Sequence, residues 1–257
     1  MTAEQYAEHW EVNSRSYHDE GYYSWMSDQL ENTATVLEVG CGSGNGTRAL
    51  VKKGRHVIAV EPNKAMAELA LKRLEEMKIP VELAEISSLS SVRSDSSPRA
   101  TIFISDIFDE QLDGLINGLH LDAVVCWLIG AEPARIAAHI EKPMDSFEGS
   151  EAAAYREKLH KRCYELGKIC LKPNGLVHFV DRQGIGSWND KDHARQYFSD
   201  YYSNLAGTDY DIKKSDVLLK RLHSNMAANS RIQYISLQEN LNAVPVFGSV
   251  KAKLIHK

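Results

Sequence analysis

The chain has 257 residues, a formal net charge of −5, 25% charged residues and 43% hydrophobic residues. This composition is ordinary for a globular protein that buries a core. The 30 lysines and arginines are scattered among 35 acidic residues, which argues against the basic face that tight nucleic-acid binding requires. We therefore expect a small molecule as the partner rather than a nucleic acid.

Membrane and secretory signals are missing from the sequence. There is no run of about 18 apolar residues that would predict a membrane-spanning helix. The first residues, MTAEQYAEHWEVNSRSYHDE, are polar and acidic, unlike a signal peptide. Cys41, Cys126, Cys163 and Cys170 have no CxxC spacing and lie in apolar segments, so we interpret them as buried thiols of a reducing compartment. We expect a cytoplasmic protein without a membrane partner, and the sequence leaves its oligomeric state open.

Aromatic residues recur at helical intervals in residues 1–30. They are Tyr6, Trp10, Tyr17, Tyr22, Tyr23 and Trp25. We predict one or two helices, broken near Gly21, whose aromatic side chains dock on the rest of the protein. Residues 1–34 are thus assigned to an N-terminal helical cap or lid, and residues 35–257 to one α/β domain.

The segment from residue 35 to 100 alternates between strand and helix patterns. Strands are predicted at 35–39 and 56–61, because both are short apolar, β-branched runs. Helices are predicted at 47–53 and 64–78. The serine-rich stretch 87–100 is typical of an exposed insertion. The third strand of the sheet is either 81–86 or 101–108, and the sequence does not decide between them.

The alternation continues through residue 181. We predict a helix at 109–119, a strand at 121–129, an amphipathic helix at 151–170, a KPNG turn and a strand at 176–181. A polar, aromatic stretch follows at 187–205, and then a helix from Ser215 to about Met226, with Ser215 as its N-cap. The runs 231–239 and 245–256 alternate like strands and predict a hairpin. Together these elements predict an α/β fold with a doubly wound, mostly parallel sheet and helices on both faces.

A glycine-rich turn follows the first predicted strand in the segment VLEVGCGSGNG. Gly40, Gly42 and Gly44 allow the backbone to approach a ligand closely where a helix begins. The G-x-G-x-x-G spacing of dinucleotide sites fails in both registers, because Asn45 or Thr47 takes the last position, and no GKS or GKT phosphate-loop motif occurs. Glu38 would repel a pyrophosphate and suits an ammonium group better. Glu61, at the end of the second strand, can accept hydrogen bonds from both hydroxyls of a ribose.

VLEVGCGSGNGT followed by VIAVEPNKAM resembles the class I S-adenosylmethionine-dependent methyltransferases over roughly residues 35–181. The resemblance implies a Rossmann-like sheet of seven strands with a C-terminal antiparallel hairpin, and S-adenosylmethionine as cofactor, giving S-adenosylhomocysteine. It implies that Glu38 and the Gly40–Gly44 loop, with Cys41, hold the methionine part and that Glu61 binds the ribose. The other implied cofactor contacts are Tyr17, Pro62, Met66, Asp106, Ile107, Cys126 and Trp127.

Two departures from the family limit what the sequence says of the substrate. The fourth strand ends in CWLIG rather than in an N/D-P-P-Y/F type motif, which argues against methylation of adenine N6 or glutamine. Asp181 is one candidate ligand for a metal-dependent enzyme, but no partner set accompanies it, so no metal is assigned.

Methyl transfer from a sulfonium is an in-line displacement that needs alignment of the acceptor and exclusion of water. A general base is needed only where the acceptor must lose a proton early. His18 is our catalytic candidate, with His178 and His193 considered beside it. Candidate substrate contacts are Tyr22, Trp127, Tyr197 and Tyr201. The sequence thus predicts a methyltransferase for a small molecule, with RNA or protein methylation, or cofactor binding without catalysis, as alternatives.

Overall fold

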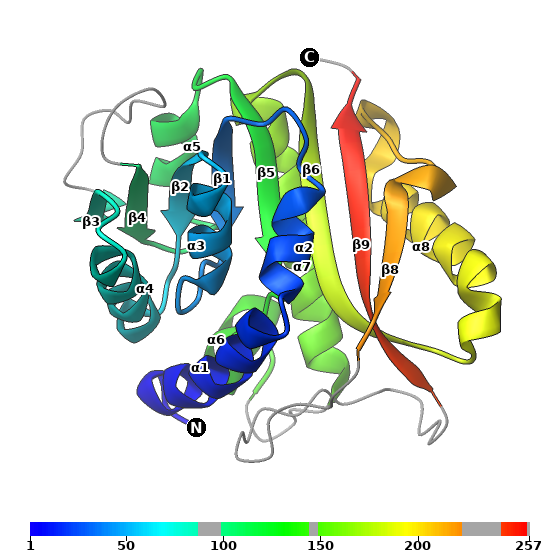
Figure 1. The fold of residues 1–257 in the computed structure, drawn as a ribbon, viewed down its shortest axis with the longest axis horizontal. Coiled ribbons are helices and arrows are strands. Elements are labelled where there is room, and N and C mark those ends of the chain that lie inside the picture. The colour runs from blue at the N-terminus through cyan, green and yellow to red at the C-terminus, as the bar shows by residue number, and fades with distance from the viewer. Residues whose placement is uncertain (87–98, 144–148, 223–242, 256–257) are drawn as a thin grey trace.

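A largely parallel β-sheet forms the centre of the molecule in the computed structural model, which describes residues 1–86, 99–143, 149–222 and 243–255 (Figure 1). The described strands are β1 (Thr35–Val39), β2 (His56–Val60), β3 (Val81–Glu85), β4 (Ala100–Ile104), β5 (Leu121–Trp127), β6 (Leu171–Ile185), β7 (Tyr210–Asp211), β8 (Val217–Arg221) and β9 (Val244–Leu254). Their order is β3-β4-β2-β1-β5-β6-β9-β7, and β8 also pairs with β9. The six strands from β3 to β6 in this order are parallel, whereas β9 runs antiparallel to β6, β7 and β8.

The predicted α/β class is confirmed, but the predicted number of seven strands is wrong, because the described residues form nine. Both candidates for the third strand belong to the sheet. β4 lies beside β2, with Phe103 opposite Val60, and β3 forms the edge beyond β4. Most of the serine-rich stretch between them lies outside the described residues.

The helix predicted from Ser215 is also wrong for its described part. Residues Lys214–Asp216 form a single 3₁₀ turn, and Val217 begins strand β8, which pairs antiparallel with β9. Val217 is buried opposite Val250, so packing against the sheet overrides the capping preference of Ser215. The predicted strand 231–239 lies outside the described residues, and the predicted strand 245–256 is β9.

The predicted KPNG turn lies within β6 rather than before it. Asn174 has a positive φ of 65°, and the pairing register of β5 with β6 shifts between Leu121 and Ala123. The turn residues are therefore accommodated as an irregularity of one long strand.

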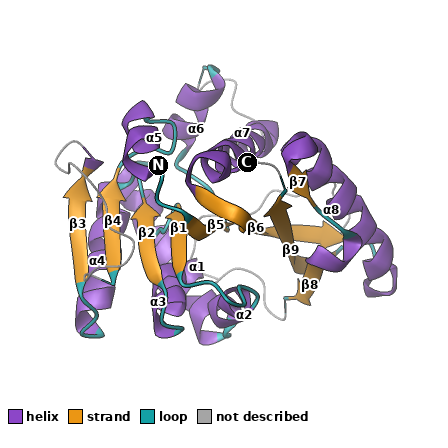
Figure 2. Ribbon diagram, turned by 90° about the horizontal axis from the view of Figure 1, so that it is seen from above, coloured by secondary structure: helices purple, strands orange, loops and turns teal. Residues whose placement is uncertain are grey.

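Helices cover both faces of the sheet (Figure 2). They are α1 (Ala3–Asp19), α2 (Tyr22–Asp28), α3 (Asn45–Lys52), α4 (Lys64–Glu76), α5 (Glu110–Ile116), α6 (Pro133–Ile140), α7 (Gly149–Cys170) and α8 (Lys191–Ala206). Two hydrophobic cores result, one beneath α1 to α4 and the other beneath α5 to α8. Strand β1 serves both, since Leu37 packs in the second core and Val36 in the first.

Helix α1 lies at the edge where β1 and β5 end, and α2 lies in front of β5 and β6 (Figure 1). The chain breaks between α1 and α2 at Gly21, as predicted, where φ is 77°. The amide of Asn63 donates to the carbonyl of Ala3 over 2.8 Å, and Arg73 forms an ion pair with Glu11 at 2.6 Å. These contacts hold α1 against α4.

All four cysteines are buried and none of them forms a disulfide bond, as expected of thiols in apolar segments. Across the described ranges, no helix combines the length and the hydropathy that crossing a bilayer would require.

Candidate functional site

The glycine-rich turn between β1 and α3 brings the backbone against neighbouring elements. Gly40 has a φ of 72°, and a Cβ there would collide with the side chain of Ile129. Gly44 has a φ of 82°, and a Cβ there would lie 2.7 Å from the Cβ of Ala70 on α4. A side chain is therefore disfavoured at both positions, because φ is positive and because a Cβ would clash with a neighbouring residue.

Glu61 ends β2 beside this turn. Its Oε2 accepts a hydrogen bond from the backbone N–H of Gly42 over 2.8 Å, and its Oε1 accepts one from Asn63 over 2.9 Å. Burial raises the pKa of the Glu61 carboxyl to about 7. Each carboxylate oxygen keeps a second lone pair that can accept from a ligand.

Glu38 lies beneath the turn rather than in the open site. The hydroxyl of Thr47 donates to its Oε2 over 2.6 Å, and Gly46 leaves room for its Oε1. Burial raises the pKa of Glu38 to about 7, and the nearby charge of Glu61 acts in the same direction. This carboxylate therefore supports the start of α3 in the structure.

A pocket, open at its mouth, lies where β1, β2, β4 and β5 end. The carboxyl ends of parallel strands are where open α/β sheets bind ligands. The pocket is lined by Tyr6, Val39, Gly40, Val60, Glu61, Pro62, Asn63, Met66, Asp106, Ile107, Ile129, Gly130, Ala131, Glu132, Arg135, Tyr155 and Leu159.

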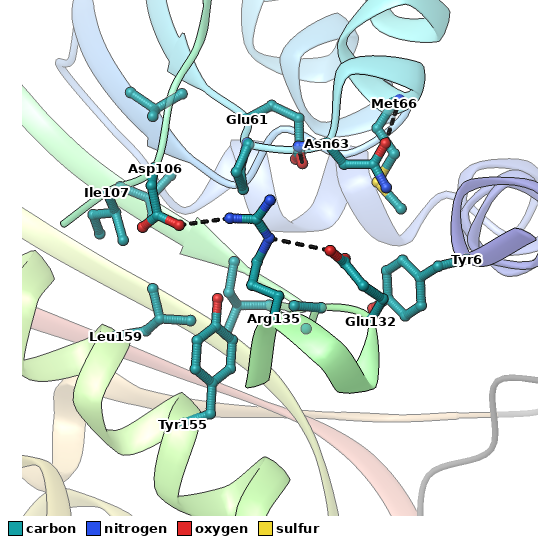
Figure 3. A pocket seen from close by; sticks show the side chains of 17 residues that line it. Tyr6, Glu61, Asn63, Met66, Asp106, Ile107, Glu132, Arg135, Tyr155 and Leu159 are labelled. Carbon is teal, nitrogen blue, oxygen red and sulfur yellow. Dashed lines mark hydrogen bonds and ion pairs between the residues drawn. The ribbon is translucent and has the colours of Figure 1, made fainter. Parts of the chain in front are cut away.

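A cluster of charged residues crosses this pocket (Figure 3). Arg135 of α6 donates from Nη1 to Oδ2 of Asp106 over 2.7 Å and from Nε to Glu132 over 3.3 Å. His139 lies 2.9 Å from the same oxygen of Asp106. The other oxygen, Oδ1, accepts from the N–H of Phe108 over 3.1 Å. Asp106 thereby ties the loop after β4 to α6.

Six of the predicted cofactor residues line the pocket together. They are Gly40, Glu61, Pro62, Met66, Asp106 and Ile107. Gly42 and Gly44 lie in the same turn, and Cys41 is buried within it. Residues of the pocket that the sequence did not suggest include Tyr6, Asn63, Glu132, Arg135 and Tyr155. The segment after β5 carries no motif, and only the folded chain brings α6 and α7 to the end of β2.

Other predicted residues lie outside the pocket. Tyr17 and Tyr22 are buried and pack edge-on against Phe247 of β9 at centroid distances of 5.2 and 5.0 Å. Cys126 faces the core beneath α7, on the opposite side of β5 from Trp127. The indole of Trp127 packs beside Gly46 and bonds His178.

The predicted substrate residues Tyr197 and Tyr201 belong to α8, on the far side of α7 from β5 (Figure 1). Tyr197 is 61% exposed, and the hydroxyl of Tyr201 lies 3.5 Å from Glu157. His18 lies in the last turn of α1, half-buried, where burial lowers its pKa. His193 is exposed on α8. None of the pocket-lining residues within the described ranges is a histidine.

Asp181 is enclosed by protein partners. Its Oδ2 lies 3.2 Å from His160 and accepts from the hydroxyl of Tyr202 over 3.1 Å. In the described part of the chain, no group of His, Cys, Asp and Glu side chains is arranged to hold a metal ion.

Comparison with known proteins finds similarity to methyltransferases. Residues 36–128 match the family described as "Methyltransferase domain". An uncharacterized methyltransferase of Oceanobacillus iheyensis is 45% identical over 56 residues, which are 21% of this chain. The match spans about a quarter, 26%, of that relative's length.

Solved structures share the fold at low sequence identity. A geranyl diphosphate C-methyltransferase from Streptomyces coelicolor A3(2), in complex with Mg²⁺, geranyl diphosphate and S-adenosyl-L-homocysteine, has a TM-score of 0.54 and 11% identity. The superposition covers 92% of this chain and 79% of that one. A structure describing conversion of a disulfide bond into a thioacetal group during echinomycin biosynthesis has a TM-score of 0.50 and 13% identity, over 91% and 81% of the two chains.

Proposed function

Since this chain contains a methyltransferase domain of the class I, Rossmann-like type, we propose that it uses S-adenosylmethionine to methylate a small-molecule acceptor. One observation carries the proposal: a carboxylate, Glu61, and a side-chain-free turn at Gly40 line the same pocket at the carboxyl edge of the sheet. Ribose hydroxyls donate to a carboxylate at this position in nucleotide-binding sheets.

The residues present fit the adenosyl half of the cofactor. Glu61 would accept from the ribose, and Met66 and Ile107 would provide apolar walls for the adenine from either side of the β2 and β4 ends. Asp106 keeps one acceptor position on Oδ1, which the adenine amino group would use. Glu38, by contrast, is bonded to Thr47 beneath the turn, so it would act on the methionine part through the backbone of the turn.

The chain's own contribution to the reaction would be alignment and exclusion of water. The bound cofactor supplies a methyl group already activated by its sulfonium. Tyr6 and Trp10 of α1 cover the pocket and the turn, since the Trp10 indole nitrogen would lie 2.9 Å from a Cβ at Gly42. A site enclosed by a helix on one side and by α6 and α7 on the other suits a small acceptor.

The test is isothermal titration of the purified protein with S-adenosylmethionine, S-adenosylhomocysteine and NAD. We expect both adenosyl ligands to bind and NAD not to bind, with at least a tenfold loss of affinity in Glu61→Ala, the effect of about 1.4 kcal/mol. Glu75→Gln, an exposed carboxylate on α4, is the control and should bind as the wild type does. Binding of NAD alone, or of no ligand, would refute the proposal.

A further inference from the structure

Two tyrosine hydroxyls face the pocket without a partner. Tyr6 on α1 is 8% exposed and Tyr155 on α7 is 4% exposed, and both line the pocket. Within the described residues neither hydroxyl has a hydrogen-bond partner, and neither oxygen belongs to the fully buried polar atoms, so both are open to the pocket. Two unpartnered polar groups from different helices thus converge on one cavity.

Both phenols are donors at neutral pH. Burial raises the pKa of Tyr6, and the charge of Glu61 raises it further. Burial also raises the pKa of Tyr155, with a further contribution from Asp106. A phenol that stays protonated offers its O–H to a ligand and cannot serve as a base.

Arg135 adds a third donor to the same part of the pocket. Its Nη1 is used by Asp106 and its Nε by Glu132, while Nη2 bonds no residue of the described ranges. Figure 3 shows the guanidinium of Arg135 and the hydroxyl of Tyr155 directed into the same space. A guanidinium has no acceptor, so this group, unlike a phenol, can only donate.

The charged residues around these donors do not require the ligand to be an anion. Three carboxylates line the pocket beside Arg135, those of Glu61, Asp106 and Glu132. His139 does not line the pocket, but its Nε2 lies 2.9 Å from Oδ2 of Asp106. The carboxylates are already bonded to the backbone or to Arg135. What the donors lack is an acceptor oxygen, either neutral or charged.

We propose that Tyr6, Tyr155 and Arg135 form the acceptor subsite and bind a carbonyl or carboxylate oxygen of the molecule to be methylated. The proposal rests on the proposed function, because it takes Glu61, Met66 and Ile107 as the place of the cofactor. The donors then orient the substrate beside the cofactor, and a protonated amine at this position would face the positive charge of Arg135.

The test uses benzoate, benzamide and benzylamine as probes, titrated by NMR into protein saturated with S-adenosylhomocysteine. We expect benzoate or benzamide, or both, to bind at millimolar concentration and benzylamine not to bind. Binding of benzoate alone would identify a carboxylate as the group that the subsite binds. Binding of benzamide alone would identify a neutral carbonyl. Tyr155→Phe and Arg135→Gln should each weaken the bound probe by about tenfold, the usual effect of removing one hydrogen bond to such a group.

Matched controls separate the subsite from general damage. Tyr210→Phe deletes a buried hydroxyl that bonds Tyr164 outside the pocket, and Arg195→Gln removes an arginine of α8 with a side chain as exposed as that of Arg135. Both should bind the probes as the wild type does. Tyr155→Phe should also unfold at about the same temperature as the wild type, because it removes no hydrogen bond within the described residues.

Three outcomes would overturn the proposal. Binding of benzylamine in preference to benzoate and benzamide would show that the subsite selects a cation rather than an acceptor oxygen. Binding of no probe would show that these residues form no such subsite. The third is a loss of S-adenosylhomocysteine affinity in Tyr155→Phe and Arg135→Gln without loss for 5′-methylthioadenosine, because the donors would then serve the cofactor's own carboxylate. If the wild type fails to bind S-adenosylhomocysteine at all, the proposed function itself fails.

Discussion

The indole nitrogen of Trp127 donates a hydrogen bond to Nδ1 of His178 over 3.1 Å. His178 therefore carries its proton on Nε2 and donates to Ser249, 2.8 Å away, which in turn donates to Gln29 over 2.6 Å. Burial lowers the pKa of His178 to about 3. This histidine, considered above as a catalytic base, is the neutral centre of a chain of hydrogen bonds joining β5, β6, β9 and α2.

Ser249→Ala should destabilise the protein by about 2 to 4 kcal/mol, because it leaves buried groups of His178 and Gln29 unpaired. Urea unfolding measures the loss. Ser199→Ala, which removes a buried hydroxyl with one long bond of 3.4 Å to the carbonyl of Ile212, should cost clearly less. Equal losses for the two variants would contradict the network.

Gly44→Ala should cost about 2 to 3 kcal/mol, because the positive φ costs about 1 kcal/mol and the new Cβ meets the backbone of α4. Gly54 has nearly the same φ, 83°, but nothing lies within 4 Å of a Cβ there. Gly54→Ala should therefore show the conformational cost alone. Thermal or urea unfolding gives the loss of unfolding free energy in each variant, and the difference between the two losses is the steric cost at Gly44. Equal losses would mean that α3 and α4 move apart without cost.

Glu61 should make the ligand-free protein less stable as the pH rises from about 4.5 to 7. Its pKa is raised to about 7 in the folded chain from the ordinary 4.5, so the folded state binds the proton more tightly in that interval. The effect is up to about 3 kcal/mol, at about 1.4 kcal/mol for each pH unit. Urea unfolding between pH 5 and 8 should show a flatter pH dependence for Glu61→Gln than for the wild type. A parallel pair of curves would show that Glu61 titrates normally.

The pair of His160 and Asp181 should act in a different pH interval. Burial alone would lower the pKa of His160, but the charge of Asp181, whose Oδ2 lies 3.2 Å away, outweighs it and raises that pKa to about 9. The stability from this pair is complete below about pH 6.5 and is lost as the pH rises through 9. Asp181→Asn should thus cost about 3 kcal/mol near pH 6 and markedly less near pH 9.5, as measured by urea unfolding. A loss independent of pH would mean that His160 is neutral throughout.

The alternation of strands and helices up to residue 181 was predictable because each parallel strand is buried on both faces and reads as an apolar run. The region after β6 was harder. Val217 begins a strand whose only support is the antiparallel partner β9, and local signals such as Ser215 cannot report a partner that lies about thirty residues along the chain.

The residues of the candidate site also differ in how far the sequence predicts them. Glu61 and Gly40 lie in motifs of adjacent sequence, so their meeting could be predicted. Arg135 and Tyr155 reach the pocket only because α6 and α7 return across the end of the sheet. The helical periodicity of 151–170 places Tyr155 on the apolar face, but no local signal places either residue at the pocket. Glu38 was predicted to contact the ligand because of its place in the motif. The hydroxyl of Thr47, at the start of α3, instead donates to Glu38 and holds its carboxylate below the glycine-rich turn.

The position of β9 has a consequence for how the protein is made. This last described strand lies inside the sheet, between β6 and β7, and its Ser249 and Phe247 meet Gln29, Tyr17 and Tyr22 from the beginning of the chain. Helices α1 and α2 emerge from the ribosome before β9 and cannot complete their packing until residues near 250 have followed. During synthesis the edge of β6 and the aromatic residues of α1 and α2 stay uncovered, and this is the interval in which a chaperone would have most to protect.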